Sequence, residues 1–568
     1  MDKKQLFTMI LLATTTLFAG AQVRIGGHLA VMDSLTNTCI CPIAHEAFGT
    51  DLTTTVTFGT DSAAFAIIDN DSVPQGGNYT FSNITGGKKW TMAIDGNRFD
   101  LTFTYLPVMV MEGTFGYEYV QGTVMVLEPD RYNETVMPAR VKWRGATTNI
   151  DGRNKRNYHI KFVDGDGNKT DRSFMGLRKD NSWIMDAGQV DFARIRNRVA
   201  TELWGDMCRP PYYADQEPKA KSYVDGGMVE VILNGKYAGC YALTEAMDRK
   251  QMKLKKFNEN TGEIHGQLWK AKDLTNSTTF NIYKPFDNNS ETWAGFETKY
   301  PELDEVAPTD YTALAEAVWF GDTCSFYDFN LKAEQYYDMP VMIDYNIFLQ
   351  TLLGIDNYGK NIYWACYDRA VDPKVTLAVW DLDVSMGGNW TTKEVHPSTM
   401  SPTRNITFAN GILGRICKPQ TKFWQQSIDR YRQLRQDVLD PDSIKQRYID
   451  AVNNIKLCGA MDREQNRWSR DTDLSGKPLD IEGELAYICD WIDKRIDFID
   501  NNYFVEPLKG DVNNDKVVDI ADINELINII LGYGNDGIMS NVSADVNHDE
   551  VVDIADVSTI INIMLHIK

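Results

Sequence analysis

Basic residues are scarce in this chain relative to acidic ones. Its 568 residues include 58 Lys and Arg against 79 Asp and Glu, which gives a formal net charge of -21. This charge opposes binding to nucleic acids and anionic lipids, because both are themselves negative. The composition therefore excludes nucleic acid as a main partner, while a hydrophobic content of 43% is enough for a large buried core.

Long apolar runs are also missing. No segment beyond the first residues approaches the ~20 apolar residues that span a bilayer, so we expect no transmembrane segment. The apolar stretch Leu6 to Phe18 follows Asp2-Lys3-Lys4 and precedes Ala19-Gly20-Ala21. This order is typical of a cleavable signal peptide over residues 1–21, and no Cys stands beside the cleavage site to carry a lipid anchor. We therefore predict a secreted, periplasmic or cell-surface protein.

Cysteines are few and irregularly spaced. There are nine, an odd number, so at least one has no disulfide partner. Their spacing does not match a metal site. Cys240, Cys366 and Cys489 lie in apolar stretches, where we interpret them as core residues.

Residues 22–138 have the pattern of β-structure. Runs of alternating apolar and polar residues at 53–58, 89–94 and 101–105 are separated by Gly, Asn and Asp. Alternation of this kind is typical of strands with one buried face. We expect a small sandwich that serves as a spacer or adhesive module, since no chemistry is visible in it.

The residues around Asp356 carry the pattern most easily linked to chemistry. Asp356 and Asn361 stand five positions apart, two apolar strands follow at 362–367 and 375–380, and Asp381 comes directly after the second. A hairpin would return Asn361 and Asp381 to one end, which is the order of a protein kinase. Taken alone, the same pattern is also that of a polar turn followed by a strand-end cap.

Phosphoryl transfer explains why these residue types would stand together. The reaction needs a carboxylate that orients the attacking hydroxyl, and Mg²⁺ or Mn²⁺ bound at the phosphates. Asp356 fits the first role. Asn361 and Asp381 fit the second, with Asp383 as a rival or additional metal ligand.

Several segments then follow one another in an order that resembles a known family. They are Trp143-Arg144-Gly145, residues 158–162, 196–204, 230–239 and 243–245, and Trp380-Asp381-Leu382-Asp383. In this order they resemble the CotH family of atypical, kinase-like proteins over residues 139–505. The resemblance implies a two-lobed domain that transfers phosphate from ATP, with Mg or Mn, to hydroxyls of a protein substrate that the sequence does not identify.

The resemblance also assigns roles in the nucleotide site. Arg144 begins a polar loop that would cover the phosphates, and Lys161 would neutralise them. Glu202 would hold Lys161 in place, with Glu245 as its competitor. The loop after Arg144 has neither the Walker pattern nor the Gly-x-Gly-x-x-Gly of ordinary kinases.

Residues 506–568 contain one pattern twice. Oxygen-bearing side chains at positions 1, 3, 5, 9 and 12 of a twelve-residue loop, with the backbone carbonyl at position 7, suit Ca²⁺. The first copy consists of Asp511, Asn513, Asp515, Val517, Asp519 and Asp522, and the second of Asp545, Asn547, Asp549, Val551, Asp553 and Asp556. Each loop leads into an apolar helix, and we predict two calcium sites.

This duplicated loop and helix resembles type I dockerin domains. The resemblance implies docking to a cohesin-like protein. Lys516 and Glu550 stand at position 6 of the loops, where Gly is usual.

The expected fold class is α+β, with an N-terminal β-rich region, a two-lobed kinase-like domain and an EF-hand-like dockerin at the C-terminus. We predict an exported atypical protein kinase docked through calcium. The alternative is a non-catalytic scaffold or adhesin, because ATP is scarce outside the cytoplasm. A polysaccharide hydrolase is a weaker third hypothesis, since no pattern of sugar-binding aromatic residues surrounds the acids.

Overall fold

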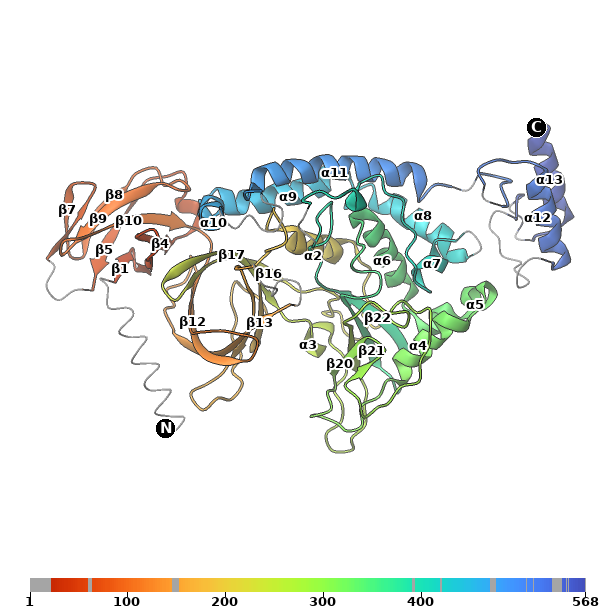
Figure 1. The fold of residues 1–568 in the computed structure, drawn as a ribbon, viewed down its shortest axis with the longest axis horizontal. Helices are drawn as coiled ribbons and strands as arrows, with labels where there is room; N and C mark the ends of the chain where they lie inside the picture. The colour runs from red at the N-terminus through yellow and green to blue at the C-terminus, as the bar shows by residue number, and fades with distance from the viewer. Residues whose placement is uncertain are drawn as a thin grey trace.

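The computed structural model describes residues 22–566, except 60–63, 146–152, 391–393, 419–420, 470–476, 507, 514, 534–543, 548 and 550. These residues form a mixed α+β structure with four sheets and twelve α-helices (Figure 1). The predicted signal peptide lies outside them. Within the described part of the chain, no helix is both long enough and apolar enough to cross a membrane.

The N-terminal region is a two-sheet sandwich, as its alternating pattern predicts. A four-stranded sheet (order β2-β1-β5-β8) and a six-stranded sheet (order β3-β4-β10-β9-β6-β7) contribute to one apolar core that includes Phe81, Trp90 and Phe103. The elements are β1 (Val23–Ile25), β2 (His28–Leu29), β3 (Val31–Asp33), β4 (Thr38–Pro42), η1 (His45–Ala47), β5 (Leu52–Phe58), β6 (Phe65–Ile68), β7 (Asp71–Pro74), β8 (Gly77–Phe81), β9 (Lys89–Ile94) and β10 (Asn97–Thr104).

A closed barrel follows, in the strand order β11-β12-β13-β14-β15-β17-β16. Its strands are β11 (Val108–Glu112), β12 (Val120–Leu127), β13 (Met137–Arg144), β14 (Asn157–Phe162), β15 (Ser182–Asp186), β16 (Gly226–Leu233) and β17 (Lys236–Glu245). The barrel therefore begins before the domain boundary expected at residue 138. The reason is that β11 pairs in parallel with the distant β16, a pairing that no local sequence pattern reveals.

The third β-unit is a five-stranded sheet in the order β19-β20-β18-β21-β22. Its strands are β18 (Gln267–Ala271), β19 (Thr292–Trp293), β20 (Phe296–Tyr300), β21 (Ile362–Asp368) and β22 (Asp372–Val379). The predicted hairpin of β21 and β22 is present, and Ile362 pairs with Val379 at its open end. One apolar cluster joins this sheet to the barrel, through Ile184 on the barrel side and Tyr363 and Trp380 on the sheet side.

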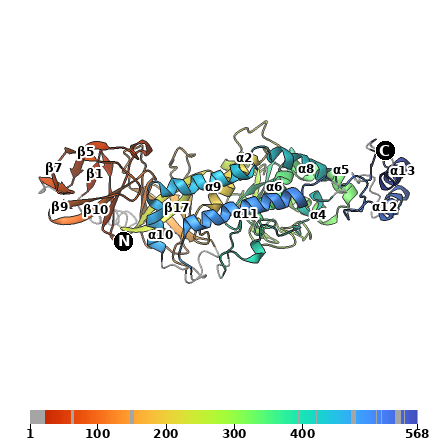
Figure 2. The ribbon, with the colours of Figure 1, turned by 90° about the horizontal axis from the view of Figure 1, so that it is seen from above.

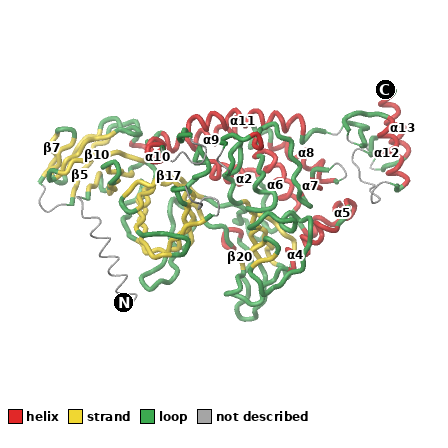
Figure 3. Tube along the Cα trace, in the orientation of Figure 1, coloured by secondary structure: helices red, strands yellow, loops and turns green. Residues whose placement is uncertain are grey.

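Helices cover one side of both β-units. They are α2 (Arg196–Met207), α3 (Arg249–Met252), α4 (Thr312–Thr323), α5 (Phe326–Tyr336), α6 (Met339–Leu352), η3 (Ser398–Met400), α7 (Leu413–Ile416), α8 (Lys422–Leu434), α9 (Pro441–Lys456), α10 (Ala460–Trp468) and α11 (Ile481–Asn502). Helices α9 and α11 run side by side along the long axis of the molecule (Figure 2). Most of the helices lie above the barrel and the sheet, whereas α4 and α5 lie beside the sheet, where they pack against β22 (Figure 3).

The C-terminal module contains α12 (Ile520–Leu531) and α13 (Ile554–Met564), which pack together at the end of the molecule opposite the sandwich (Figure 1). Each helix begins at a capping box made by two loop acids, Asp519 with Asp522 and Asp553 with Asp556. In a capping box the two side chains satisfy backbone N–H groups that the first turn leaves free.

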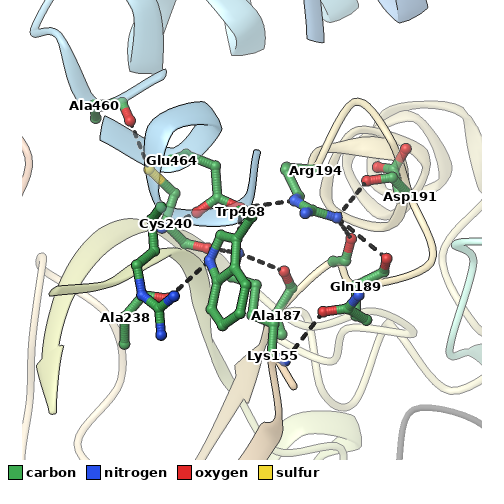
Figure 4. Close-up of polar contacts among 12 residues, drawn as sticks. Lys155, Ala187, Gln189, Asp191, Arg194, Ala238, Cys240, Ala460, Glu464 and Trp468 are labelled. Atoms are coloured by element: carbon green, nitrogen blue, oxygen red, sulfur yellow. Dashed lines mark hydrogen bonds and ion pairs between the residues drawn. The ribbon is translucent and has the colours of Figure 1, made fainter. Parts of the chain in front are cut away.

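A buried charge cluster fixes α10 to the barrel (Figure 4). The carboxylate of Glu464 accepts hydrogen bonds from Nζ of Lys155 at 2.8 Å and from Nε of Arg194 at 2.7 Å. Its second oxygen accepts from the backbone N–H of Cys240 at 2.8 Å. Burial lowers the pKa of Lys155, whereas the two cations together hold the pKa of Glu464 below its ordinary value against its own burial.

All nine cysteines are free thiols. Cys240 and Cys366 are buried core residues as predicted, whereas Cys489 on α11 is only partly buried.

Candidate functional site

The loop that carries Asp356 is held between a buried helix and the end of a strand. Helix α6 is buried over almost its whole length and ends at Leu353, which has a left-handed conformation (φ 52°). Asn357, 1% exposed, donates from Nδ2 to the backbone carbonyl of Trp380 at 2.9 Å. This bond ties the loop to the end of β22, so the positions of Asp356 and Asp381 depend on each other.

Asp356 and Asn361 contact each other directly. Nδ2 of Asn361 donates to Oδ2 of Asp356 at 2.7 Å, and Nζ of Lys360 lies 2.8 Å from Oδ1. Burial raises the pKa of Asp356, Lys360 opposes that shift, and the charge of Asp381 adds to it. Asn361 and Asp381 both have positive φ angles (57° and 58°), a strained conformation that Asn and Asp tolerate better than most residues.

Asp381 and Asp383 face further acids. Burial raises the pKa of Asp383 well above its ordinary value, and the carboxylates of Asp381, Asp186 and Asp356 add to the rise. Asp186 is also held in place, because its Oδ2 accepts from Nδ2 of Asn197 at 2.6 Å. The Oδ1 of Asn197 in turn accepts from the backbone N–H of Leu382 at 2.9 Å. A divalent cation would offset the repulsion among these carboxylates.

The acids do not form a complete metal cage by themselves. Across the described ranges, no three Asp, Glu, His or Cys side chains are arranged so that they could hold a metal ion. The predicted ligands are the carboxylates of Asp381 and Asp383 and the amide oxygen of Asn361. The protein would therefore supply only part of the coordination shell of the metal ion. Mg²⁺ at phosphoryl-transfer sites takes its remaining ligands from phosphates and water, so the donor set fits this kind of metal.

Two cations lie close to the ring of Trp380, the residue that directly precedes Asp381. The guanidinium of Arg144 lies 5.3 Å from the ring centre of Trp380, and Nζ of Lys270 lies 5.8 Å from the same ring centre. Burial and the charge of Arg144 lower the pKa of Lys270 to about 8, against the attraction of Asp381. Two neighbouring cations that repel each other favour the binding of an anion, because the anion offsets their repulsion.

A pocket opens beside this pair, between the barrel, α2 and the end of β22. Its polar wall includes Arg144, Asp186, Asn197 and Asp381, and its apolar wall consists of Ile184, Val224, Ala242, Val379 and Trp380. Of the predicted nucleotide-site residues, Arg144 therefore does line the pocket that also contains Asp381.

The two C-terminal loops share one hydrogen-bond pattern. Asp511 accepts from the backbone N–H groups of Asp515 and Lys516 at 3.0 and 2.8 Å, and Asp522 accepts from Val512 at 2.7 Å. The backbone N–H of Asn513 also donates to Asp522, at 3.1 Å. In the second loop, Asp549 N–H donates to Asp545 at 3.1 Å, as Asp515 does to Asp511, and Asn547 N–H donates to Asp556 at 3.0 Å, as Asn513 does to Asp522.

Both twelfth-position acids, Asp522 and Asp556, are fully buried, and their carboxylates accept hydrogen bonds from backbone N–H groups of their own loops. Such an all-oxygen set fits Ca²⁺. Lys516 takes the position usually held by Gly, with a φ of 70°, whereas Glu550 lies outside the described residues.

Comparison with family sequence models decides the family of the chain. The model described as CotH kinase protein matches residues 141–499, which is more than half of the 568 residues. The chain belongs to the CotH kinase family. The model of the dockerin type I domain matches residues 509–565, so the C-terminal module is a type I dockerin domain. A comparison with curated proteins found no match.

Within the CotH domain, the predicted pair of Lys161 and Glu202 does not form. Glu202 is half-exposed on α2 and accepts from Nε of Arg198 at 2.8 Å. Lys161 lies 5.0 Å from the ring centre of Tyr119. The physical reason is the alternation of β14, in which Tyr158, Ile160 and Phe162 fill the barrel and Lys161 faces outward.

Glu245, the competitor, is buried and accepts from the backbone N–H of Arg178 at 2.9 Å. Neither acid therefore holds Lys161.

Sequence reasoning missed three residues of the CotH site. Lys270 has the one sequence signal that points to it, a lysine inside the otherwise apolar segment Leu268 to Ala271. Asn197 belongs to the segment 196–204 that carries the resemblance, but neither its position nor that of Asp186 predicts a contact with the pocket of Asp381, because only the fold brings them there.

Proposed function

We propose that the CotH domain is an atypical protein kinase that transfers the γ-phosphate of ATP to protein hydroxyl groups. The observation that carries this proposal is the juxtaposition of Asp356, Asn361 and Asp381 at one end of the β21–β22 hairpin, facing Arg144 and Lys270. A carboxylate, a metal-binding pair and two cations are the groups that phosphoryl transfer requires.

Each residue has a separate role in this proposal. Asp356 orients the attacking hydroxyl and accepts its proton, and Lys360 and Asn361 hold the carboxylate in position. Asn361, Asp381 and Asp383 would hold Mg²⁺ or Mn²⁺, which when bound offsets the charge of the phosphates.

The nucleotide would bind at the mouth of this pocket, whose cavity of about 30 Å³ is too small to enclose it in the free protein. Arg144 and Lys270 would bind the phosphates as charge-assisted donors. The apolar wall formed by Ile184, Val224 and Ala242 would contact the adenine ring.

The dockerin module adds a docking function. We propose that it binds two Ca²⁺ ions through the two loops and a cohesin-like protein through its helices. Together with the apolar leader sequence, this supports an exported protein attached to a partner outside the cytoplasm.

Phosphate transfer by purified protein tests the proposal. Wild-type protein incubated with Mg²⁺ or Mn²⁺ and radiolabelled ATP should label itself or a generic protein substrate. The variants Asp356→Ala and Asp381→Ala should lose at least about a hundredfold of that rate, since each removes a group used in the transition state. Equal labelling by wild type and both variants would refute the kinase assignment.

A non-catalytic scaffold or adhesin is the second candidate, because ATP is scarce outside the cytoplasm, where the leader sequence would direct the protein. Thermal unfolding with and without ATP and Mn²⁺ separates the two. A nucleotide that binds only the folded state raises the melting temperature. No shift at millimolar ATP would favour the scaffold.

A further inference from the structure

A row of positive side chains runs along the outside of the barrel toward Arg144. On β13, Arg140, Lys142 and Arg144 occupy alternate positions and therefore face the same side of the sheet. Arg140 pairs in register with Lys161 on β14, and Lys142 pairs with His159. Four cations of two neighbouring strands are thus gathered on one outer face.

The cations are grouped around one aromatic ring. The guanidinium of Arg140 and the Nζ atoms of Lys142 and Lys161 lie 5.4, 4.7 and 5.0 Å from the ring centre of Tyr119. The hydroxyl of Tyr119 is bonded to Nδ1 of His159 at 2.9 Å. Contacts with the ring face hold the cations in place without neutralising them.

No acid of the described residues pairs with Arg140, Lys142 or Lys161 within ion-pair distance, whereas most lysines and arginines of the helices have such a partner. The nearest acid influence on Lys161 is Glu302, and it is outweighed by burial and by the cations Lys169, Lys142 and Arg140, which together lower the pKa of Lys161. Burial, followed by the charges of Arg144, Lys161, Lys142 and Lys299, lowers the pKa of His159 to about 3. In a chain with a net charge of -21, three neighbouring cations without an acidic ion-pair partner among the described residues, Arg140, Lys142 and Lys161, are unusual.

We propose that this row, Arg140, Lys142 and Lys161, is a docking surface for an acidic polypeptide segment. Because the row ends at Arg144 beside the pocket, a segment bound along it points toward Asp356, and the acidic segment would belong to the phosphate acceptor. This second statement rests on the proposed kinase function, whereas the binding itself does not.

Fluorescence anisotropy with the full chain tests the surface. The probe is a labelled peptide of about ten residues, rich in Glu with one central Ser, measured without ATP at low salt and again at high salt. The variant Arg140→Gln/Lys142→Gln/Lys161→Gln should weaken binding by about tenfold or more, because three exposed charge pairs are lost. Binding should also weaken as salt rises, since exposed charges are screened.

The matched control is Lys332→Gln/Lys456→Gln/Lys494→Gln, which removes the same charge from three helices where each lysine pairs with an acid. It should bind as wild type does. Equal loss in both triple variants would show that only net charge matters and would overturn the proposal, as would no binding by wild type at millimolar peptide.

Tighter binding of a single-stranded oligonucleotide or of anionic vesicles than of the acidic peptide would also overturn it. A protein that binds the peptide through the row but transfers no phosphate would refute the kinase function and leave the surface intact.

Discussion

Replacing Lys270 by Met should remove nucleotide affinity without lowering the stability of the free protein. The ammonium group lies 5.7 and 5.8 Å from the ring centres of Tyr363 and Trp380, and close enough to Arg144 for their charges to oppose each other. If this pair binds the phosphates, the substitution deletes one of the two positive charges that attract them, while Met keeps much of the apolar stem.

The two effects have opposite signs. A hydrogen bond from a charged group contributes about 1.5–3 kcal/mol, so the affinity for ATP should fall about ten- to hundredfold. In the free protein the substitution removes a partly buried charge and its repulsion with Arg144, so unfolding should be unchanged or occur at a slightly higher temperature. A residue that only supported the fold would give the reverse result.

Titration of a fluorescent ATP analogue, together with thermal unfolding of the free protein, measures both effects. Lys161→Met is the matched control, because Lys161 faces Tyr119 on the outside of the barrel, and its affinity for the nucleotide should equal that of wild type. If Lys161→Met loses affinity and Lys270→Met retains it, the placement of the phosphates beside Lys270 is wrong.

Three further predictions concern stability. Glu464→Gln should lower the free energy of unfolding of the CotH domain by about 3–5 kcal/mol in denaturant titrations, because it leaves two buried cations without their carboxylate; a loss below about 1 kcal/mol would contradict the role of the cluster. Burial raises the pKa of Asp338 to about 6, so ionisation of its carboxyl group destabilises the folded protein. Its contribution to stability should therefore fall as pH rises from about 4 to about 6. Asp338→Asn should gain about 2–3 kcal/mol relative to wild type between about pH 4 and pH 7, and a pH-independent difference would contradict this. Chelation of calcium should destabilise the dockerin helices by about 3–4 kcal/mol if calcium had been present at 100 to 1,000 times its dissociation constant, and circular dichroism of the full chain with and without chelator measures this; Asp522→Ala should remove part of the effect, and an unchanged signal would argue against calcium binding.

Local sequence patterns were enough to predict structures formed by residues that are close in the sequence. The β21–β22 hairpin follows from two apolar runs and a turn, and the capping boxes of α12 and α13 follow from acids at fixed spacing. Both depend on interactions within a few tens of residues.

Interactions between distant segments could not be predicted in the same way. Lys155 and Glu464 are 309 positions apart, and their pairing exists only because α10 packs on β17. The orientation of Lys161 could not be predicted for the same reason, since sequence order does not reveal which face of β14 turns toward the pocket. The calcium ligands and Asp356 remain predictions that experiment must test.

The central claim is that Asp381 and Asn361 bind a metal ion that also contacts a nucleotide. Crystals of the full chain grown with Mn²⁺ and a non-hydrolysable ATP analogue test it directly, because Mn²⁺ is located by its anomalous scattering. We expect a peak about 2 Å from oxygens of Asp381 and Asn361, with the triphosphate within hydrogen-bond distance of Lys270. Manganese confined to the dockerin loops, with no nucleotide beside Trp380, would contradict the account.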